Sequence, residues 1–286
     1  MNIPLVPASL DIILGRTRDV DPVTRKLVYN GVLQSKLGHP RQLSIAQREQ
    51  IVKDGLGDRE PGVRVAAGKL VASWFDTAMA EASKTEESTW KGDDGGVMKG
   101  LIHFLGLFDV VGPGEAVAVD AALSILTTRP DIPDVFTFEG SSVCNPIFCE
   151  LSISSFLATI DNYWNELTSE SVVLARVFVE HCVSTQNEAR LESASLPVVT
   201  AFAFHIQEAY NALLAVLQDI ETANLLRAGL EQEEEEELEE ELVKREIILG
   251  ELLRIALRLD YSDEIGRRKV FSVVSLYLFF LLDTCY

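Results

Sequence analysis

The sequence has few basic residues for its length. Its 286 residues include 25 Lys and Arg against 44 Asp and Glu, which leaves a formal net charge of −19. Nucleic acids and anionic membranes are both bound through basic surfaces. We therefore do not expect the chain as a whole to bind either one.

Cysteine is also scarce. The four cysteines are too few for the disulfide framework of a small secreted domain. Residues 1–15 have no basic leader and include Asp11, so we expect no secretory signal there. These features favour a reducing compartment, the cytosol or the nucleus.

Motifs for catalysis and metal binding are missing from the sequence. It has no P-loop, nucleophile elbow, HExxH motif or dinucleotide-binding turn, and the Gly-rich residues 92–100 follow no strand. The spacing of the best zinc candidates, which are Cys144, Cys149, His181 and Cys182, is not a standard ligand pattern. We predict no catalytic residues, no metal, no cofactor and no small-molecule substrate.

The longest uncharged apolar run lies near the end of the sequence, at residues 270–282. A transmembrane helix needs about 20 such residues, so this run is too short to span a bilayer. We interpret it as a buried tail and expect no membrane contact. A peripheral membrane protein that uses this tail is the hypothesis we weigh against that interpretation.

One pattern occurs twice, 39 residues apart. It reads DVDPVTR at residues 19–25 and DREPGVR at residues 58–64, and an apolar helical stretch follows each copy. A period of about 40 residues built on helix pairs is typical of HEAT and armadillo repeats. The pattern predicts an all-α fold, a HEAT-repeat α-solenoid or α-α superhelix, that presents surfaces to large partners.

Helix-start signals support this fold. Asp21 is placed as an N-cap before Pro22, Ser44 and Gln47 form a capping-box pattern, and Thr168 is placed to cap a later helix. Period-2 alternation with turn residues, the mark of β-hairpins, is not found. We expect helices at residues 10–16, 23–34, 44–55, 63–80, 98–110, 113–126, 171–186 and 197–217, a linker at 127–138, a helix break near Asp219, and a last helix from Asp260. A buried face is expected at Val63, Ala66, Ala67, Leu70, Val71 and Trp74.

The basic residues are concentrated in the first quarter of the chain. Residues 16–69 hold eleven Lys and Arg against six acidic residues, a charge of +5, so the remainder carries −24. A polyanionic partner should therefore contact this segment. The candidates for DNA phosphate contacts are Arg16, Arg18, Lys26, Lys36, Arg41 and Arg48, with an ordinary solvated surface as the alternative.

The arginines of the repeated pattern have a different interpretation. Arg25 and Arg64 are expected to pair with the turn residues Asp19 and Asp58 of their own or a neighbouring repeat, forming a structural ladder. Phosphate contact is the alternative. We favour the ladder because the repeat itself sets the spacing of these residues.

Residues 231–241 carry nine acidic side chains in eleven positions. Like charges at i, i+4 repel, so we interpret this acidic run as a solvated helix or an insertion. A DNA mimic or a binding site for a basic tail is the alternative.

Four stretches of the sequence resemble a known family. They read DPVTRKLVY at residues 21–29, LSIAQR at 43–48, LARVFVEH at 174–181 and GELLRIALRLDYSDEIGRRK at 250–269. Together they resemble the CAP-G type of HEAT-repeat subunit, subunit 3 of nuclear condensin, in its fungal form. The last stretch is the most specific, because generic HEAT repeats do not share it.

The resemblance covers most of residues 3–138, 162–190 and 240–269. Members of this family are several-fold longer, so the chain resembles only an interior to C-terminal part of one. The organisation we expect is HEAT repeats at 1–138 with a basic start, a departure from the family pattern at 139–161, helical repeats at 162–230, the acidic run at 231–241, a family-specific helical repeat at 242–269, and a divergent apolar tail at 270–286.

The resemblance implies a non-catalytic scaffold subunit of condensin that acts in mitotic chromosome condensation. The implied partners are the kleisin and SMC subunits, and double-stranded DNA that this subunit class grips together with the kleisin. The family's main DNA and kleisin grooves lie largely N-terminal to the part that this chain resembles, so the DNA contact expected of this chain is the one through its basic first repeats. The implied location is the nucleus and the chromosome, with a cytoplasmic pool. The alternative function is a HEAT adaptor of another complex, for transport or as a phosphatase scaffold, with protein partners only.

Overall fold

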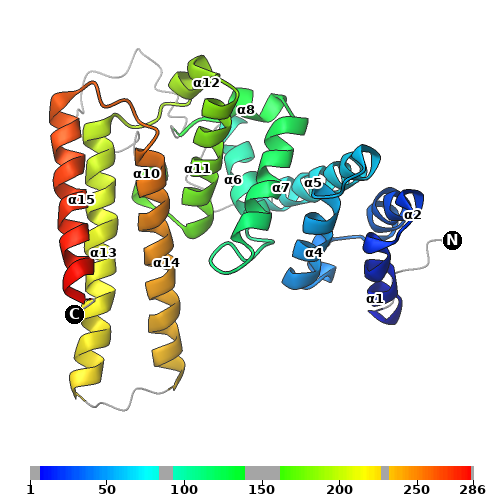
Figure 1. The fold of residues 1–286 in the computed structure, drawn as a ribbon, viewed down its shortest axis with the longest axis horizontal. Helices are drawn as coiled ribbons and strands as arrows, with labels where there is room; N and C mark the ends of the chain where they lie inside the picture. The colour runs from blue at the N-terminus through cyan, green and yellow to red at the C-terminus, as the bar shows by residue number, and fades with distance from the viewer. Residues whose placement is uncertain (1–6, 84–92, 139–161, 227–231, 285–286) are drawn as a thin grey trace. The chain divides into compact units, whose positions relative to one another are not determined.

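The computed structural model describes residues 7–83, 93–138, 162–226 and 232–284 (Figure 1). Within these ranges every regular element is helical and no strand occurs, so the fold is all-α as predicted. The chain divides into two compact units, residues 1–160 and residues 161–286. Each unit is described by itself.

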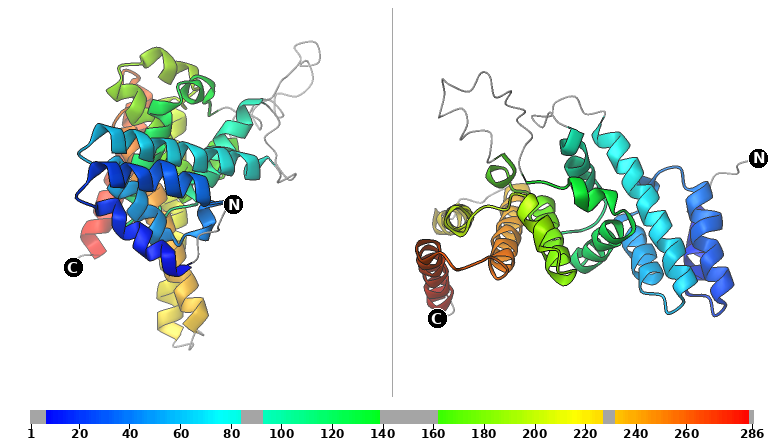
Figure 2. Two further views of the ribbon diagram at one scale, coloured as in Figure 1. Left: turned by 90° about the vertical axis from the view of Figure 1, so that its right-hand side faces the viewer. Right: turned by 90° about the horizontal axis from the view of Figure 1, so that it is seen from above.

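The first unit is a series of packed helices. Its central element α5 contacts α4, α6 and α7, and also the segment from α2 to the π-helical turn η2 (Figure 2). The elements are α1 (Pro7–Gly15), η1 (Arg16–Arg18), α2 (Pro22–Leu27), η2 (Val28–Leu33), α3 (Gln34–Lys36), η3 (Pro40–Gln42), α4 (Ile45–Leu56), α5 (Pro61–Ala82), α6 (Asp93–Leu105), α7 (Glu115–Thr128) and α8 (Asp131–Val135).

The helix-start signals in this unit are confirmed. The Asp21 carboxylate accepts hydrogen bonds from the backbone N–H groups of Val23 and Thr24, and Pro22 is the first helical residue. Ser44 and Gln47 form both bonds of the capping box. The expected apolar face of α5, from Val63 to Trp74, is buried.

The helix expected at residues 23–34 is not a continuous α-helix. Residues 28–33 form a π turn between α2 and α3. Gly31 lies in this turn, and a Cβ atom there would lie 2.6 Å from Leu27 Cδ1. The missing side chain therefore makes room for Leu27 beside the wider turn.

The predicted linker at residues 127–138 is wrong in part. Its residues 131–135 form α8, and Ile132, Phe136 and Phe138 are all buried. The rings of Phe136 and Phe138 meet edge to face with centroids 5.2 Å apart. Burial of these apolar side chains outweighs the turn-forming tendency of Pro130 and Pro133.

The second unit is built on three long helices and a buried one. The long helix α13 lies beside both α14 and α15 (Figure 1), and α11 contacts α14. The capping box at Thr168 is confirmed. The elements are α10 (Asn162–Asn165), α11 (Ser169–Ser184), α12 (Glu188–Ser193), α13 (Val199–Leu226), α14 (Gln232–Ala256) and α15 (Glu264–Thr284).

Two helix boundaries in this unit differ from expectation. The break expected near Asp219 is wrong, because α13 continues to Leu226 and Asp219 is an exposed residue that the helix tolerates. The last helix starts at Glu264, with the Asp263 carboxylate accepting from the N–H groups of Ile265 and Gly266. It continues through the apolar tail to Thr284.

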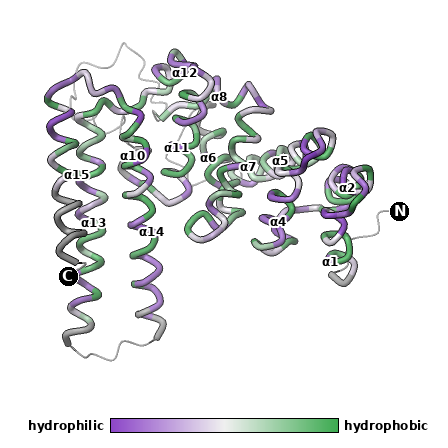
Figure 3. The backbone as a smooth tube through the Cα atoms, viewed as in Figure 1, coloured by the Kyte–Doolittle hydropathy of each residue, from purple (hydrophilic) through white to green (hydrophobic). Residues whose placement is uncertain are grey.

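Most of the acidic run belongs to α14. Figure 3 shows this hydrophilic stretch in the lower half of the helix. Lys244 and Arg245 pair with Glu240 and Glu241 at i, i+4, with N–O distances of 2.8 and 2.7 Å. No helix among the described residues is long and apolar enough to cross a membrane.

Candidate nucleic-acid interface and inter-repeat contacts

Arg25 joins the two copies of the repeated pattern. Its Nε and Nη2 atoms donate to the two carboxylate oxygens of Asp58 at 2.6 and 3.0 Å, and both side chains are 6% exposed. Its Nη1 atom donates to the backbone oxygens of Asp19 and Val20 at 2.7 and 3.1 Å. The guanidinium therefore holds its own turn and the turn of the next repeat.

The turn aspartates accept several hydrogen bonds. The Arg25 guanidinium is the main cause that lowers the pKa of Asp58, and the backbone N–H of Glu60 lowers that pKa further. The backbone N–H of Asp21 is the main cause that lowers the pKa of Asp19, followed by the hydrogen bond from Arg16. Both carboxylates are therefore ionised at neutral pH.

Arg64 repeats only half of this arrangement. Its Nη1 atom donates to the backbone oxygens of Asp58 and Arg59 at 2.7 and 2.9 Å, six and five residues earlier, as Arg25 does in the first copy. Arg64 is exposed and forms no ion pair with a described carboxylate. Its contacts stay within its own repeat.

Three of the proposed phosphate-contact residues lie near the first turn. Arg16 pairs with Asp19 at 2.8 Å and Arg18 with Asp54 at 3.1 Å, while their side chains stay 63% and 66% exposed. Lys26 is exposed and has no ion pair within the described ranges. All three can be reached from solution.

Two further candidates, Lys36 and Arg41, lie in the segment that joins η2 to α4. Lys36 is half-buried. Arg41 is 52% exposed and lies 3.8 Å from the Glu81 carboxylate, which also accepts from His39 and His103 at 2.5 and 3.1 Å. Burial alone would raise the pKa of Glu81, but the hydrogen bonds from the two histidines outweigh it and lower the pKa.

Arg48 does not fit a phosphate contact in this structure. It is 6% exposed, and its guanidinium donates to the backbone oxygens of Leu107, Leu43 and Pro40 at 2.6, 2.8 and 3.4 Å. Burial lowers its pKa. Its side chain links α4 to the segment before it and to the loop that follows α6, so we correct its assignment to a structural one.

Other exposed bases were not predicted as candidates from the sequence. Lys53, Arg59 and Lys69 lie in the same segment, are exposed, and form no ion pair among the described residues. Lys53 precedes the second copy of the repeated pattern, Arg59 lies inside it and Lys69 follows it. The pattern gives no signal that separates these three residues from structural bases. Their availability depends on burial and pairing, which the sequence does not show.

The second unit holds a buried ion pair that the sequence also did not reveal. Arg176 of α11 donates through Nε to Glu251 of α14, and the two residues are 7% and 3% exposed. Glu180 and Arg254 flank the pair, at 3.0 Å from Arg176 Nη1 and 2.6 Å from Glu251 Oε1. The pair connects the two family-like stretches of this unit.

A partial third copy of the turn occurs before α15. Asp263 caps the helix as Asp21 caps α2, and Arg267, four residues on, donates to the backbone oxygen of Tyr261 at 3.4 Å.

Among the described residues no group of His, Cys, Asp or Glu could hold a metal ion. Cys182 is buried, and Cys144 and Cys149 of the zinc candidates lie outside the described residues.

The sequence of this chain is similar to that of a condensin subunit from several organisms. No protein-family model matches the chain. Condensin complex subunit 3 of Schizosaccharomyces pombe is 29% identical over 271 residues, which are 94% of this chain and 23% of that protein. The Xenopus laevis and Homo sapiens proteins of the same name are 29% and 28% identical over 93% of this chain.

A structural match points to the same subunit as the sequence similarity. A chain in the crystal structure of the S. pombe condensin Cnd3-Cnd2 subcomplex matches 97% of this chain at a TM-score of 0.68 and 28% identity. This chain is similar to part of condensin complex subunit 3. Its fold is that of a HEAT-repeat solenoid, as the repeated pattern predicted.

The similarity concerns one part of condensin complex subunit 3. This chain spans 23% of the S. pombe protein and 21% of the Xenopus laevis protein, which is less than a quarter of either length. Two of the stretches that carry the resemblance, residues 174–181 and 250–269, lie in the described part of the chain. The Arg176–Glu251 pair joins them in the folded structure.

Proposed function

We propose that this chain is part of a non-catalytic HEAT-repeat scaffold subunit of condensin, which acts in mitotic chromosome condensation. The observation that carries the proposal is the similarity to condensin complex subunit 3, which extends over 94% of this chain for the S. pombe protein. The location that follows from this role is the nucleus and the chromosome, with a cytoplasmic pool.

The proposed protein partners are the kleisin and SMC subunits of condensin. The crystal structure with the similar fold is a subcomplex of Cnd3 with Cnd2, so a longer chain that contains a region like this one forms a complex with a second condensin subunit. We propose that the present chain contacts the kleisin directly and the SMC subunits through the complex.

A contact with double-stranded DNA is proposed for the basic first repeats. The support is the charge of +5 over residues 16–69 and the solvent access of several of its bases. Arg16, Arg18, Lys26, Lys36 and Arg41 stay in the candidate set, and Lys53, Arg59 and Lys69 join it. The ladder role of Asp19, Arg25, Asp58 and Arg64 is to fix the two turns beside which Arg16, Arg18, Lys26 and Arg59 lie.

Co-purification from mitotic cells tests the proposed complex. The chain carries an affinity tag, and the tag alone is the control. Recovery of kleisin and SMC subunits with the tagged chain, and not with the control, is the expected result. Recovery of transport cargo or phosphatase subunits in their place would favour the other type of HEAT adaptor and contradict the proposal.

A further inference from the structure

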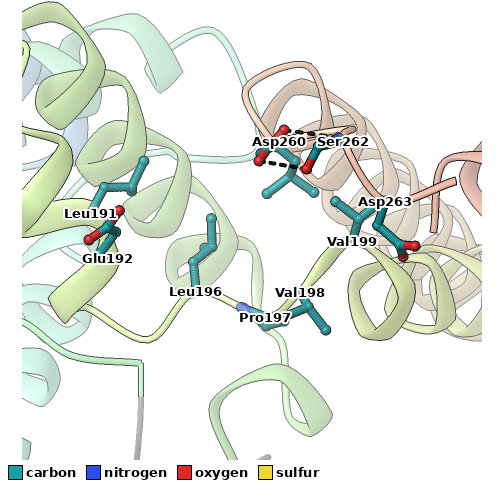
Figure 4. A pocket seen from close by; sticks show the side chains of 10 residues that line it. Leu191, Glu192, Leu196, Pro197, Val198, Val199, Asp260, Ser262 and Asp263 are labelled. Carbon is teal, nitrogen blue, oxygen red and sulfur yellow. Dashed lines mark hydrogen bonds between the residues drawn. The ribbon is translucent and has the colours of Figure 1, made fainter. Parts of the chain in front are cut away.

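A pocket of about 350 Å³ lies at one end of the second unit (Figure 4). One wall is the connection between α12 and α13, and the other is the connection between α14 and α15. Its size is at the lower end of the range for ligand pockets, enough for one or two side chains. The apolar residues that line it are Leu191, Leu196, Pro197, Val198, Val199 and Leu259.

Three acidic residues line the same pocket, although the Asp263 carboxylate is turned toward the start of α15 (Figure 4). Glu192, Asp260 and Asp263 all line the pocket, and none forms an ion pair within the described ranges. The backbone N–H groups of Gly266 and Ile265 lower the pKa of Asp263, so it is ionised at neutral pH. The pocket therefore combines an apolar surface with negative charge.

The two walls are fixed to one another. Thr200 Oγ1 of α13 donates to Asp263 Oδ2 across the start of the two helices at 3.2 Å. A Cβ atom at Gly266 would lie 3.0 Å from both Thr200 Oγ1 and Val199 Cβ, so a side chain there would force the start of α15 away from α13. The pocket is thus formed before any ligand arrives, which reduces the ordering cost of binding.

The first wall has a fixed shape as well. Ser195 has φ 57°, a left-handed conformation that non-glycine residues seldom adopt, and its N–H donates to the Glu192 backbone oxygen at 3.2 Å. This turn directs residues 196–198 along the pocket. Val198 is left 73% exposed, although it is apolar.

We propose that this pocket binds a short peptide segment of a protein partner, in which one or two apolar side chains are flanked by Lys or Arg. The apolar side chains occupy the pocket and the basic residues pair with Glu192 and Asp260. Phosphate groups would meet three carboxylates, so nucleic acid is not the ligand of this site. The proposal concerns residues outside the basic repeats and does not rest on the condensin assignment.

Fluorescence anisotropy with the full 286-residue chain tests the site. The probe is a labelled peptide GKRLSLKRG. We expect it to bind, and we expect Val198→Trp, which fills the pocket, and Glu192→Lys, which reverses its charge, each to weaken binding by about fivefold or more. Two matched substitutions of exposed residues outside the pocket, Leu257→Trp and Glu221→Lys, should leave the affinity unchanged.

Two control peptides separate the pocket from general attraction to an acidic chain. GKRSSSKRG keeps the charge without the apolar side chains, and GEELSLEEG keeps the apolar side chains with reversed charge. Both should bind more weakly than the probe. Equal binding of GKRSSSKRG, an unchanged affinity in Val198→Trp, or no binding of the probe would each overturn the proposal.

Discussion

Arg25 and Arg64 hold equivalent positions in the repeated pattern but have different surroundings. Arg25 is buried against the Asp58 carboxylate of the next repeat, whereas Arg64 is exposed and donates only to backbone oxygens of its own turn. Removing one partner of a buried ion pair leaves the other without compensation for its lost hydration. The stability of the first unit therefore depends on Arg25 far more than on Arg64.

This difference is testable by substitution of each arginine. Arg25→Ala should lower the urea midpoint of unfolding clearly, because Asp58 is left buried without its partner. Arg64→Ala should change the unfolding free energy by no more than about 0.5 kcal/mol, as for most exposed residues. Arg25→Lys should not restore stability, because an ammonium group cannot donate to both carboxylate oxygens in the same geometry. Equal effects of the two alanine variants would contradict the assignment.

The low pKa of Asp58 makes the same contact depend on pH. The ordinary pKa of this carboxyl is 3.8, and the hydrogen bond from Arg25 lowers it in the folded state. The stabilisation is therefore fully present above pH 3.8 and is lost as the pH falls through the lower folded value. Asp58→Asn should be less stable than the parent chain at neutral pH, and the difference should shrink below pH 3.8. A difference that grew in acid would contradict this prediction.

Gly55 allows three elements of the first unit, α4, α5 and η2, to pack closely. A Cβ atom at Gly55 would lie 2.5 Å from Ala67 Cβ and 2.7 Å from Tyr29 Cε1, so α4 passes α5 and the η2 turn with no space for a side chain. Tyr29 is fully buried and its hydroxyl donates to the Ile51 backbone oxygen at 3.1 Å. Gly55 thus sets the spacing of three elements.

Two glycine-to-alanine substitutions should have opposite effects. Gly55→Ala should destabilise the chain by about 1–3 kcal/mol, because the neighbours must move to admit the methyl group. Gly250 lies inside α14, and a Cβ atom there would have no neighbour within 4 Å, so Gly250→Ala should raise helix propensity and stabilise by up to about 1 kcal/mol. Urea unfolding of both variants measures the effects. A stabilising Gly55→Ala would show that the helices can separate freely.

The charge distribution is the main property at the scale of the whole molecule. Residues 16–69 carry +5 in a chain whose net charge is −19. The proposed DNA binding must therefore be local and must compete with repulsion from the acidic remainder. Such binding is expected to be strong only at low salt, where phosphate contacts release counterions.

Titration of a duplex of about 30 base pairs against the full chain tests this expectation. The logarithm of the binding constant should fall with the logarithm of salt concentration by about 0.9 for each phosphate contacted. Lys26→Glu should weaken binding and reduce this slope, whereas Arg258→Glu, an exposed reversal in the second unit, should have a smaller effect. No binding at tens of micromolar protein in low salt would remove DNA from the proposed partners.

Helix type and several helix starts could be predicted from the sequence. The capping residues Asp21, Ser44 and Thr168 act locally, through hydrogen bonds to groups two or three residues away. The local sequence is therefore enough to predict where these helices start. The apolar spacing of α5 likewise predicts its buried face. The break expected near Asp219 failed because an exposed acidic residue costs a long packed helix little.

The role of each basic residue was decided only by the tertiary structure. Arg48 and Lys26 look alike in the sequence, yet Arg48 is buried against three backbone oxygens while Lys26 is exposed. The Arg25–Asp58 and Arg176–Glu251 pairs join residues 33 and 75 positions apart. Local composition determined that the chain forms paired helices, whereas burial and long-range pairing depend on which faces pack together, and only the folded chain fixes that.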